Sequence, residues 1–276
     1  MAEPIAVMVV GASGKMGREV VKAVAGAPDL RLVAAVERAG TGQDVGEMAG
    51  LGRALGVALT EDLERALESS GAEVMVDFTR PEGLLARIMA ALRHGVRPVI
   101  GTTGLSRSEV DQVAAFAQQR RLGCLIAPNF AIGALVMMRC CELAARYFEQ
   151  AEIVELHHPG KVDSPSGTAL KTADVIAQAR TKAAVTPLTT PGAESERVAG
   201  VRGGEYAGVR LHSVRLPGLV AHQEVLFGNA GEVFTLRHDS LSRESFMPGV
   251  LLAIRKVVGL SGLVYGLDKL VFADQA

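Results

Sequence analysis

The chain has 276 residues, and its 29 basic and 30 acidic side chains leave a net charge of −1. This length suggests two domains of ordinary size, and 49% hydrophobic residues are enough to build their cores. The balanced charge excludes a broad basic face for nucleic acid, and an aromatic content of 4% leaves few platforms for base stacking, so we expect a small-molecule partner.

Strand-like and helical patterns alternate along the first 128 residues. Apolar runs predict strands at residues 5–10, 32–36, 74–78, 96–100 and 122–127. Helical spacing between them predicts helices at residues 16–24, 62–69, 81–94 and 106–120. Nearly continuous apolar runs are typical of strands covered on both faces. The alternation therefore predicts a Rossmann-like doubly wound parallel sheet.

The pattern changes after Pro128. We expect a long helix at residues 132–150, a strand at 153–156, a helix at 168–181 and a mobile surface loop at 185–205. Alternating apolar and polar residues then predict strands at 209–215, 221–227 and 232–237. These elements indicate a second α+β domain with a mainly antiparallel open sheet. A last helix, at residues 246–258, is expected to pack on the first domain.

The first motif with chemical meaning lies between the first strand and the first helix. It reads Gly11-Ala12-Ser13-Gly14-Lys15-Met16-Gly17. Glycine has no Cβ, so the backbone can turn tightly and approach a pyrophosphate, which the positive end of the helix dipole attracts. The spacing is a variant of the usual dinucleotide-binding fingerprint, and its position between strand and helix supports that interpretation.

Glu37 and Arg38 follow the second strand, where such folds hold the adenosine ribose. A carboxylate accepts hydrogen bonds from ribose hydroxyls and repels a 2′-phosphate, whereas a guanidinium can pair with that phosphate or stack on adenine. We therefore predict that both NADH and NADPH are usable.

A second constellation, His157-His158-Pro-Gly-Lys161, precedes Ser166-Gly167-Thr168 at the start of a helix. Histidine exchanges protons near neutral pH, and an ammonium group can hold a carboxylate or supply a proton. Ser166 is placed to cap the helix, whose first N–H groups could bind an anion. One short segment could therefore form a pocket for a small carboxylate. The rival interpretation, a zinc site, has no third nearby ligand.

Three further segments lie beyond the ends of predicted strands, where a doubly wound fold binds ligands. The segment Asp77-Phe78-Thr79-Arg80-Pro81 ends one strand and is expected to line the same crevice. The other two could contact a nicotinamide ring and are Gly101, Thr102 and Thr103, and Ala127, Pro128, Asn129 and Phe130.

The remaining histidines and the cysteines have no predicted role in chemistry. We interpret His94, His212, His222 and His238 as surface or hydrogen-bonded core residues. The three cysteines show no CxxC spacing and are predicted to be buried thiols in a reducing compartment; they are Cys124, Cys140 and Cys141.

Taken in order, these motifs resemble the 4-hydroxy-tetrahydrodipicolinate reductase (dihydrodipicolinate reductase) family of lysine and diaminopimelate biosynthesis. The resemblance covers essentially the whole chain, and its most specific part is ELHHPGKVDSPSGTA. It implies that His157 and Lys161 are catalytic proton-transfer residues and that His158, Gly167 and Thr168 contact the substrate. It also implies that the dinucleotide is bound by residues 11–16, Glu37, Arg38, residues 101–103 and residues 127–130.

The resemblance further implies a hydride transfer from NADH or NADPH to a cyclic dicarboxylate, with loss of water. We accordingly assign residues 1–128, joined by 240–276, to a dinucleotide-binding domain, and residues 129–239 to substrate binding and oligomerisation. The substrate would lie between the domains, with hinges near residues 128–130 and 239–242. The resemblance implies a homotetramer.

Two alternative functions remain open from the residues alone: another two-domain NAD(P)-dependent dehydrogenase, or a dinucleotide-sensing regulator without turnover. We expect a cytoplasmic protein, because the first residues form a predicted strand rather than a signal peptide. We expect no membrane span, because no apolar stretch approaches the roughly 20 residues needed to cross a bilayer.

Overall fold

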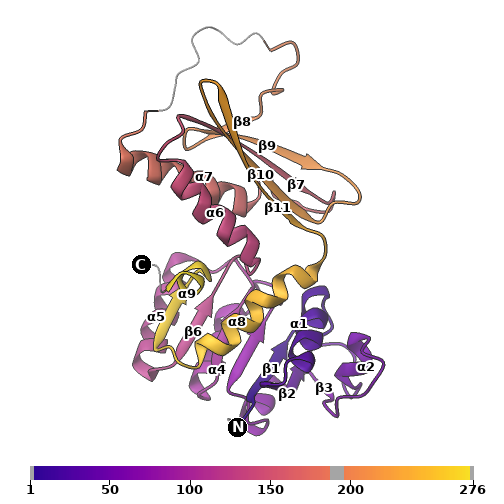
Figure 1. Ribbon diagram of the computed structural model, residues 1–276. Helices are drawn as coiled ribbons and strands as arrows, with labels where there is room; N and C mark the ends of the chain where they lie inside the picture. Colours follow the sequence, from indigo (N-terminus) through magenta and orange to yellow (C-terminus); the bar gives the residue numbers. More distant parts are fainter. Residues whose placement is uncertain (1–2, 187–195, 274–276) are drawn as a thin grey trace. The chain divides into compact units, whose positions relative to one another are not determined.

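The computed structural model describes residues 3–186 and 196–273, which form two compact units (Figure 1). The first contains residues 3–131 and 246–273, and the second the described residues of Ile132–Ser245. The limits fall after Ala131 and Ser245, not after residues 128 and 239 as the sequence suggested. Residues 129–131 remain with the first unit because the buried ring of Phe130 packs against that of Phe78, with 5.3 Å between ring centroids.

The first unit is built on a seven-stranded sheet in which each strand is parallel to its neighbours. The strand order is β12-β6-β5-β4-β1-β2-β3. The strands are β1 (Ile5–Val10), β2 (Leu30–Val36), β3 (Leu59–Thr60), β4 (Val74–Asp77), β5 (Arg97–Ile100), β6 (Gly123–Ile126) and β12 (Gly262–Tyr265). The predicted doubly wound parallel sheet is thus confirmed.

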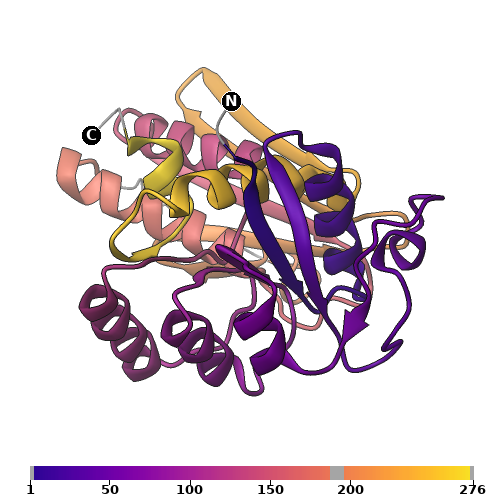
Figure 2. The same cartoon turned by 90° about the horizontal axis from the view of Figure 1, so that it is seen from below.

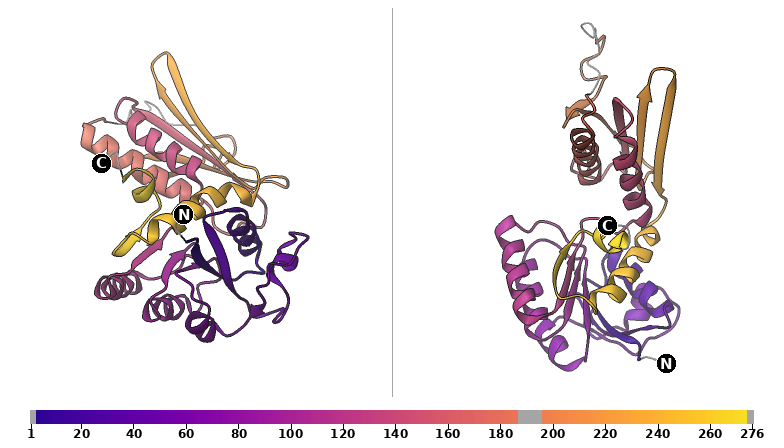
Figure 3. Two further views of the ribbon diagram at one scale, coloured as in Figure 1. Left: turned by 60° about the horizontal axis from the view of Figure 1, so that its bottom comes forward. Right: turned by 60° about the vertical axis from the view of Figure 1, so that its left-hand side comes forward.

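Helices cover both faces of this sheet, which explains why its strands are apolar on both sides. Its helices are α1 (Lys15–Gly26), α2 (Val45–Ala49), α3 (Leu63–Ser69), α4 (Leu84–Arg93), α5 (Arg107–Arg120), α8 (Met247–Val257) and α9 (Asp268–Val271). In Figures 2 and 3, α3, α4 and α5 lie side by side on one face, and α1 and α8 cover the other. Met8 and Ile100 of the sheet pack with Ile88 of α4, all fully buried. Burying each such side chain contributes about 1.5–3 kcal/mol.

Four short elements of this unit have no counterpart in the prediction: α2, β3, β12 and α9. The segment with α2 is held by local hydrogen bonds rather than by an apolar period. The Oδ1 atom of Asp44 accepts from the backbone N–H groups of Gly46 at 2.8 Å and Leu55 at 2.9 Å, and Oδ2 accepts from Gly56 at 2.8 Å. Such a carboxylate caps a helix without any signal in hydrophobic spacing.

The second unit is a five-stranded sheet with two helices, α6 (Ile132–Ala144) and α7 (Gly167–Ala183), packed on one face (Figures 1 and 3). The strand order is β11-β10-β7-β9-β8. The strands are β7 (Gln150–His157), β8 (Gly204–Tyr206), β9 (Val209–Arg215), β10 (Ala221–Asn229) and β11 (Glu232–Ser240). Neighbouring strands are antiparallel except β7 and β9, so the predicted mainly antiparallel sheet is confirmed with one parallel pair. A 3₁₀ turn at Arg243–Phe246 follows β11.

Two predictions for this unit need correction. The helix expected at residues 132–150 ends at Ala144, because Phe148 turns inward and packs on Phe227 and Phe234. The loop expected at 185–205 ends earlier, since Gly204 and Glu205 pair with β9 as part of β8. Residues 187–195 of that predicted loop lie outside the described residues.

Two further expectations concern the burial of the cysteine thiols and the presence of membrane-spanning helices. Cys124 and Cys141 are buried free thiols, but Cys140 is partly exposed, contrary to the prediction, since it is not among the residues of α6 that form the core. Across residues 3–186 and 196–273, none of the helices combines the length and apolar character that crossing a membrane requires.

Candidate active site

The glycine loop of the first unit joins β1 to α1 and has the form of a phosphate cradle. Gly11 has a φ of +79°, which favours glycine. A Cβ on Gly17 would lie 2.0 Å from the carbonyl oxygen of Gly11, so only glycine permits this close approach of helix and loop. The N-cap residue of α1, Gly14, makes no side-chain capping bond. The first N–H groups of α1 therefore have no capping side chain in their way and could bind an anion.

Glu37 lies directly after β2 and is tied to this loop. Its Oε2 atom accepts from the backbone N–H of Ser13 at 3.2 Å and from the Ser13 hydroxyl at 2.6 Å. Burial raises the pKa of Glu37, but the hydrogen bonds from Ser13 and Arg38 outweigh burial and hold the pKa below its ordinary value. An ionised carboxylate is thus fixed beside the glycine loop. Lys15 and Arg38 are exposed, and Met16 is partly buried.

Asp77 joins the loops that follow β4 and β5. Of the predicted crevice segment 77–81, Arg80 and Pro81 are exposed and Phe78 and Thr79 partly so, whereas Asp77 is fully buried. Its Oδ1 atom accepts from the Thr79 N–H at 2.9 Å and the Thr102 hydroxyl at 2.9 Å, and its Oδ2 accepts from Arg87 Nε at 2.7 Å. The same guanidinium donates to the backbone carbonyls of Arg80 at 2.8 Å and Glu82 at 2.7 Å. One buried ion pair therefore fixes both loops.

The loops after β5 and β6 lie against one another at the same edge of the sheet. The Ala127 N–H donates to the carbonyl of Ile100 at 2.9 Å. A Cβ on Gly101 would lie 2.0 Å from the ring of Phe78, so glycine lets this ring reach Phe130. Thr102 and Ala127 are buried, Asn129 and Gly101 partly so, and Thr103 and Pro128 exposed. The predicted dinucleotide residues thus gather at the carboxyl ends of adjacent strands, the usual ligand edge of this fold.

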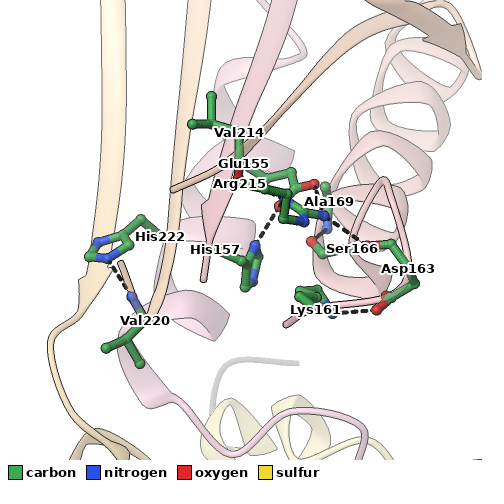
Figure 4. A network of polar contacts seen from close by, with 10 residues as sticks. All are labelled: Glu155, His157, Lys161, Asp163, Ser166, Ala169, Val214, Arg215, Val220 and His222. Atoms are coloured by element: carbon green, nitrogen blue, oxygen red, sulfur yellow. Dashed lines mark hydrogen bonds and ion pairs between the residues drawn. The ribbon is translucent and has the colours of Figure 1, made fainter. Parts of the chain in front are cut away.

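In the second unit, His157 ends β7 beside a buried carboxylate. Its Nδ1 atom contacts Oε2 of Glu155, which is fully buried two residues earlier on the same strand (Figure 4). Arg215 of β9 donates to that carboxylate from Nη1 at 3.0 Å and Nη2 at 2.8 Å. A carboxylate only accepts hydrogen bonds, so the proton of a neutral His157 ring lies on Nδ1. Its Nε2 atom is then the one that can exchange a proton.

Figure 4 shows Lys161, and Ser166 at the start of α7, beside the His157 ring. Lys161 Nζ donates to Oδ1 of Asp163 at 2.7 Å. Ser166 is buried and accepts from the Ala169 N–H at 3.2 Å, so it caps α7 as predicted. Gly167 is the first residue of α7, followed by Thr168, while His158 is exposed. A cation and a helix N-terminus thus lie close to one proton-transfer group.

The charges in this cluster set its proton affinities. Burial lowers the pKa of His157, and this is the largest effect. The Glu155 carboxylate raises the pKa, whereas the positive charges of Lys161 and Arg215 lower it further. The pKa of His157 therefore lies below its ordinary value. Burial raises the pKa of Glu155, but hydrogen bonds from Arg215, Ser213 and His157 outweigh it and keep the pKa below 4.5. At neutral pH the structure therefore favours a neutral imidazole on an ionised carboxylate.

Three residues that shape the site were not identified from the sequence: Glu155, Arg215 and Arg87. Glu155 could have been found, because residues two apart on a strand share a face and Glu155 stands two before His157. Arg215 could not, since its place opposite His157 depends on the register of β7 with β9. Arg87 could not be found either, because its role depends on how α4 packs under the loop after β4.

The other histidines are partnered or packed, as interpreted from the sequence. His94 contacts Glu64 at 2.9 Å, His212 contacts Glu152 at 2.7 Å, and His222 contacts Asp239 at 2.7 Å. Within the described residues, no group of three or more His, Cys, Asp or Glu side chains is arranged to hold a metal ion.

Comparison with known proteins places the chain in a family. The family model described as "Dihydrodipicolinate reductase, N-terminus" matches residues 5–130, and the model for its C-terminus matches residues 133–271. The chain belongs to the dihydrodipicolinate reductase family. The resemblance seen in the sequence motifs is thereby confirmed across both units.

Individual relatives of the dihydrodipicolinate reductase family agree with this assignment. The 4-hydroxy-tetrahydrodipicolinate reductase of Gloeobacter violaceus is 52% identical, with 97% of this chain and 99% of the relative covered. That of Moorella thermoacetica is 49% identical, covering 98% and 99%. A solved dipicolinate-bound dihydrodipicolinate reductase from Paenisporosarcina sp. TG-14 is 43% identical with a TM-score of 0.82, covering 96% of this chain and 99% of that one.

A more distant structure, an amine dehydrogenase from Mycobacterium smegmatis, is 16% identical with a TM-score of 0.66, covering 96% of this chain and 95% of that one. This level of identity shows a shared fold alone. As a member of the dihydrodipicolinate reductase family, the chain is an oxidoreductase that uses a nicotinamide dinucleotide.

Proposed function

We propose that this chain catalyses the NAD(P)H-dependent reduction of 4-hydroxy-tetrahydrodipicolinate to tetrahydrodipicolinate, with loss of water, in lysine and diaminopimelate biosynthesis. The single observation that carries the proposal is that His157, held by Glu155, lies near Lys161 and the start of α7, in a chain of this family. This cluster combines a proton-transfer group with two features that attract a carboxylate.

The residues of the first unit fit a nicotinamide dinucleotide. The uncapped start of α1, the close approach at Gly17 and the ionised carboxylate of Glu37 suit a pyrophosphate and a ribose. The residues that would hold the cofactor are Gly11, Ala12, Ser13, Gly14, Lys15, Met16, Glu37, Arg38, Gly101, Thr102, Thr103, Ala127, Pro128, Asn129 and Phe130. When bound, the nicotinamide supplies a hydride from its C4 atom.

Substrate recognition is assigned to the second unit. The substrate carries two carboxylates, and dipicolinate, which is bound to the Paenisporosarcina reductase, is a planar relative of it. Lys161 and the N–H groups at the start of α7, at Gly167 and Thr168, would neutralise one carboxylate, and His158 would contact the substrate.

Proton transfer is assigned to His157 and Lys161. With Nδ1 of His157 turned to Glu155, its Nε2 faces away from the carboxylate and can hold or deliver a proton to the substrate. Lys161 would serve as the second donor. The overall reaction balances: a hydride and a proton are added to the substrate, and its hydroxyl leaves as water.

Both dinucleotides are proposed to serve as cofactors. Glu37 supports NADH, because it can accept from the ribose hydroxyls, and the exposed Arg38 beside it supports NADPH, because it can pair with the 2′-phosphate.

The proposal also covers the oligomeric state of the protein and its location in the cell. A homotetramer in the cytoplasm is proposed, and the exposure of Val233 and Leu241 on and beside β11 is compatible with self-association of the second unit.

The test is oxidation of NADPH and of NADH by the purified protein in the presence of 4-hydroxy-tetrahydrodipicolinate. A blank without this substrate and a second with a sugar acid serve as controls. Oxidation that depends on the cyclic dicarboxylate supports the function. Oxidation with the sugar acid only would favour another dehydrogenase, and tight dinucleotide binding without turnover would favour a sensing regulator.

A further inference from the structure

Arg215 connects the two groups assigned to proton transfer. Its Nη1 and Nη2 atoms donate to the Glu155 carboxylate at 3.0 and 2.8 Å, and Nη2 also donates to the backbone carbonyl of Asp163 at 2.7 Å. Glu155 contacts the ring of His157, and Asp163 accepts from Lys161 through its side chain. A single guanidinium therefore reaches both the histidine and the lysine loop (Figure 4).

The position of Arg215 follows from the strand register. In the parallel pair of β7 and β9, His157 lies opposite Arg215, and Glu155 lies opposite Ser213. The long Arg215 side chain reaches back along the sheet to Glu155, on the face covered by α6 and α7. A charged side chain is stable in such a place only if it is paired. The sheet thus builds a buried ion pair directly beneath His157.

We infer that Glu155 and Arg215 are positioning residues: Glu155 holds His157 with its proton on Nδ1 and Nε2 turned to the substrate, and Arg215 fixes both Glu155 and the loop that carries Lys161. This inference rests on the proposed function. Neither residue is required to touch the substrate. Their contribution is the geometry of the two groups that do and the position of the proton on His157.

The charged groups around His157 lie on three segments of the second unit. Glu155 lies on its own strand, Arg215 on β9 and Lys161 on the following loop. The residue opposite His157 on β10 is Ala221, which carries no charge. Removal of the negative charge at Glu155 therefore leaves two positive neighbours, which disfavour a protonated imidazole.

The first test is made on the unmodified protein. Long-range nitrogen–proton correlation NMR spectra of the full-length protein, with isotopically labelled histidine, report which ring nitrogen of His157 carries the proton. The His157→Gln protein assigns the signal. We expect the Nδ1–H form at neutral pH. A predominant Nε2–H form in the unmodified protein would overturn the inference.

The second test compares Glu155→Gln with Glu152→Gln. Glu152 is a matched control, because it also lies on β7 and pairs with a histidine and an arginine, at 2.7 Å from His212 and 2.8 Å from Arg202. We expect Glu155→Gln to lower kcat on the order of 10²-fold, with a much smaller change in KM, as expected for loss of general acid–base function. Glu152→Gln should leave kcat within about twofold of the unmodified protein, as for substitutions away from the site.

The pH profile separates a positioning role from a merely structural one. In Glu155→Gln, the limb of the kcat profile that belongs to His157 should move to lower pH, because a group that raises the pKa of His157 is lost. Arg215→Lys keeps a positive charge but cannot bridge Glu155 and Asp163, and we expect it to lower kcat as well. Unchanged kcat in both Glu155→Gln and Arg215→Lys would overturn the inference.

Failure of the inference and failure of the proposed function give different results. If the unmodified protein reduces the cyclic dicarboxylate and Glu155→Gln does so equally well, the inference is wrong and the function stands. If the unmodified protein does not turn over this substrate while NMR shows the Nδ1–H form, the proposed function is wrong and the positioning geometry stands. The thermal unfolding midpoint of each variant reports whether it is folded.

Discussion

The hydroxyl of Ser13 donates to Oε2 of Glu37 at 2.6 Å, which joins the glycine loop to the carboxylate that follows β2. The two residues are far apart in the sequence, yet the parallel pairing of β1 with β2 brings them together. The residues proposed to hold the phosphates and the ribose are therefore held at one place by hydrogen bonds of the protein itself. Such preorganisation reduces the cost of ordering the site on binding.

The cofactor preference should respond in opposite directions to changes at Glu37 and Arg38. We expect Glu37→Gln to weaken NADH binding about tenfold, because charged hydrogen bonds to the ribose are lost, and to weaken NADPH less. Arg38→Ala should weaken NADPH more than NADH. Dissociation constants for both dinucleotides check this, with Arg31→Ala, at the other end of β2, as the control. Equal losses of the two affinities in Arg38→Ala would show that Arg38 does not recognise the phosphate.

The ion pair of Asp77 and Arg87 should be important for stability. Arg87→Met leaves a fully buried carboxylate without its cation, and we expect a loss of about 3–5 kcal/mol in the free energy of unfolding. Arg93→Met is the matched control on the same helix, because its ion pair with Glu64 is exposed and should contribute less than about 1 kcal/mol. Urea unfolding measures both. Similar small losses in the two variants would contradict the assigned role of Asp77.

Strands β1, β2, β4, β5 and β6 and helices α1, α3, α4, α5 and α8 of the first unit could be predicted because each of them has its own apolar period. The start of α7 was also predictable, since Ser166 is a common capping residue. The end of α6 was not, because Phe148 leaves the helical path to join Phe227 and Phe234, and both partners follow much later in the chain. The same limit applies to Arg215, whose role depends on strand register rather than on local sequence.

His157 and Lys161 should each be needed for turnover. We expect His157→Gln and Lys161→Ala to lower kcat on the order of 10²-fold or more, the usual scale for general acid–base catalysis. Dinucleotide affinity should remain, because both residues lie outside the first unit. His212→Gln is the control, since His212 lies on β9 and pairs with Glu152 instead. Near-normal turnover in both test variants would remove these residues from the mechanism.

Stability should fall with decreasing pH in two phases. Burial lowers the pKa of His157 and of His238 below 6.5, so the unfolded chain binds protons more readily than the folded one, and stability is lost as the pH falls below about 6.5. The carboxylates of Glu152 and Glu155 have pKa values below 4.5, so their stabilising contribution is lost in a second phase below that pH. Thermal unfolding midpoints across this range measure both phases. A midpoint that rises as the pH falls from 7 to 5 would contradict this prediction.

The most direct test of the account is transfer of deuterium from the cofactor to the product. The protein is supplied with NADPH deuterated at the transferred C4 position and with 4-hydroxy-tetrahydrodipicolinate, and the product is analysed by mass spectrometry. We predict tetrahydrodipicolinate that carries one deuterium and a much slower appearance of it with His157→Gln. Cofactor oxidation without a deuterated product would contradict the account.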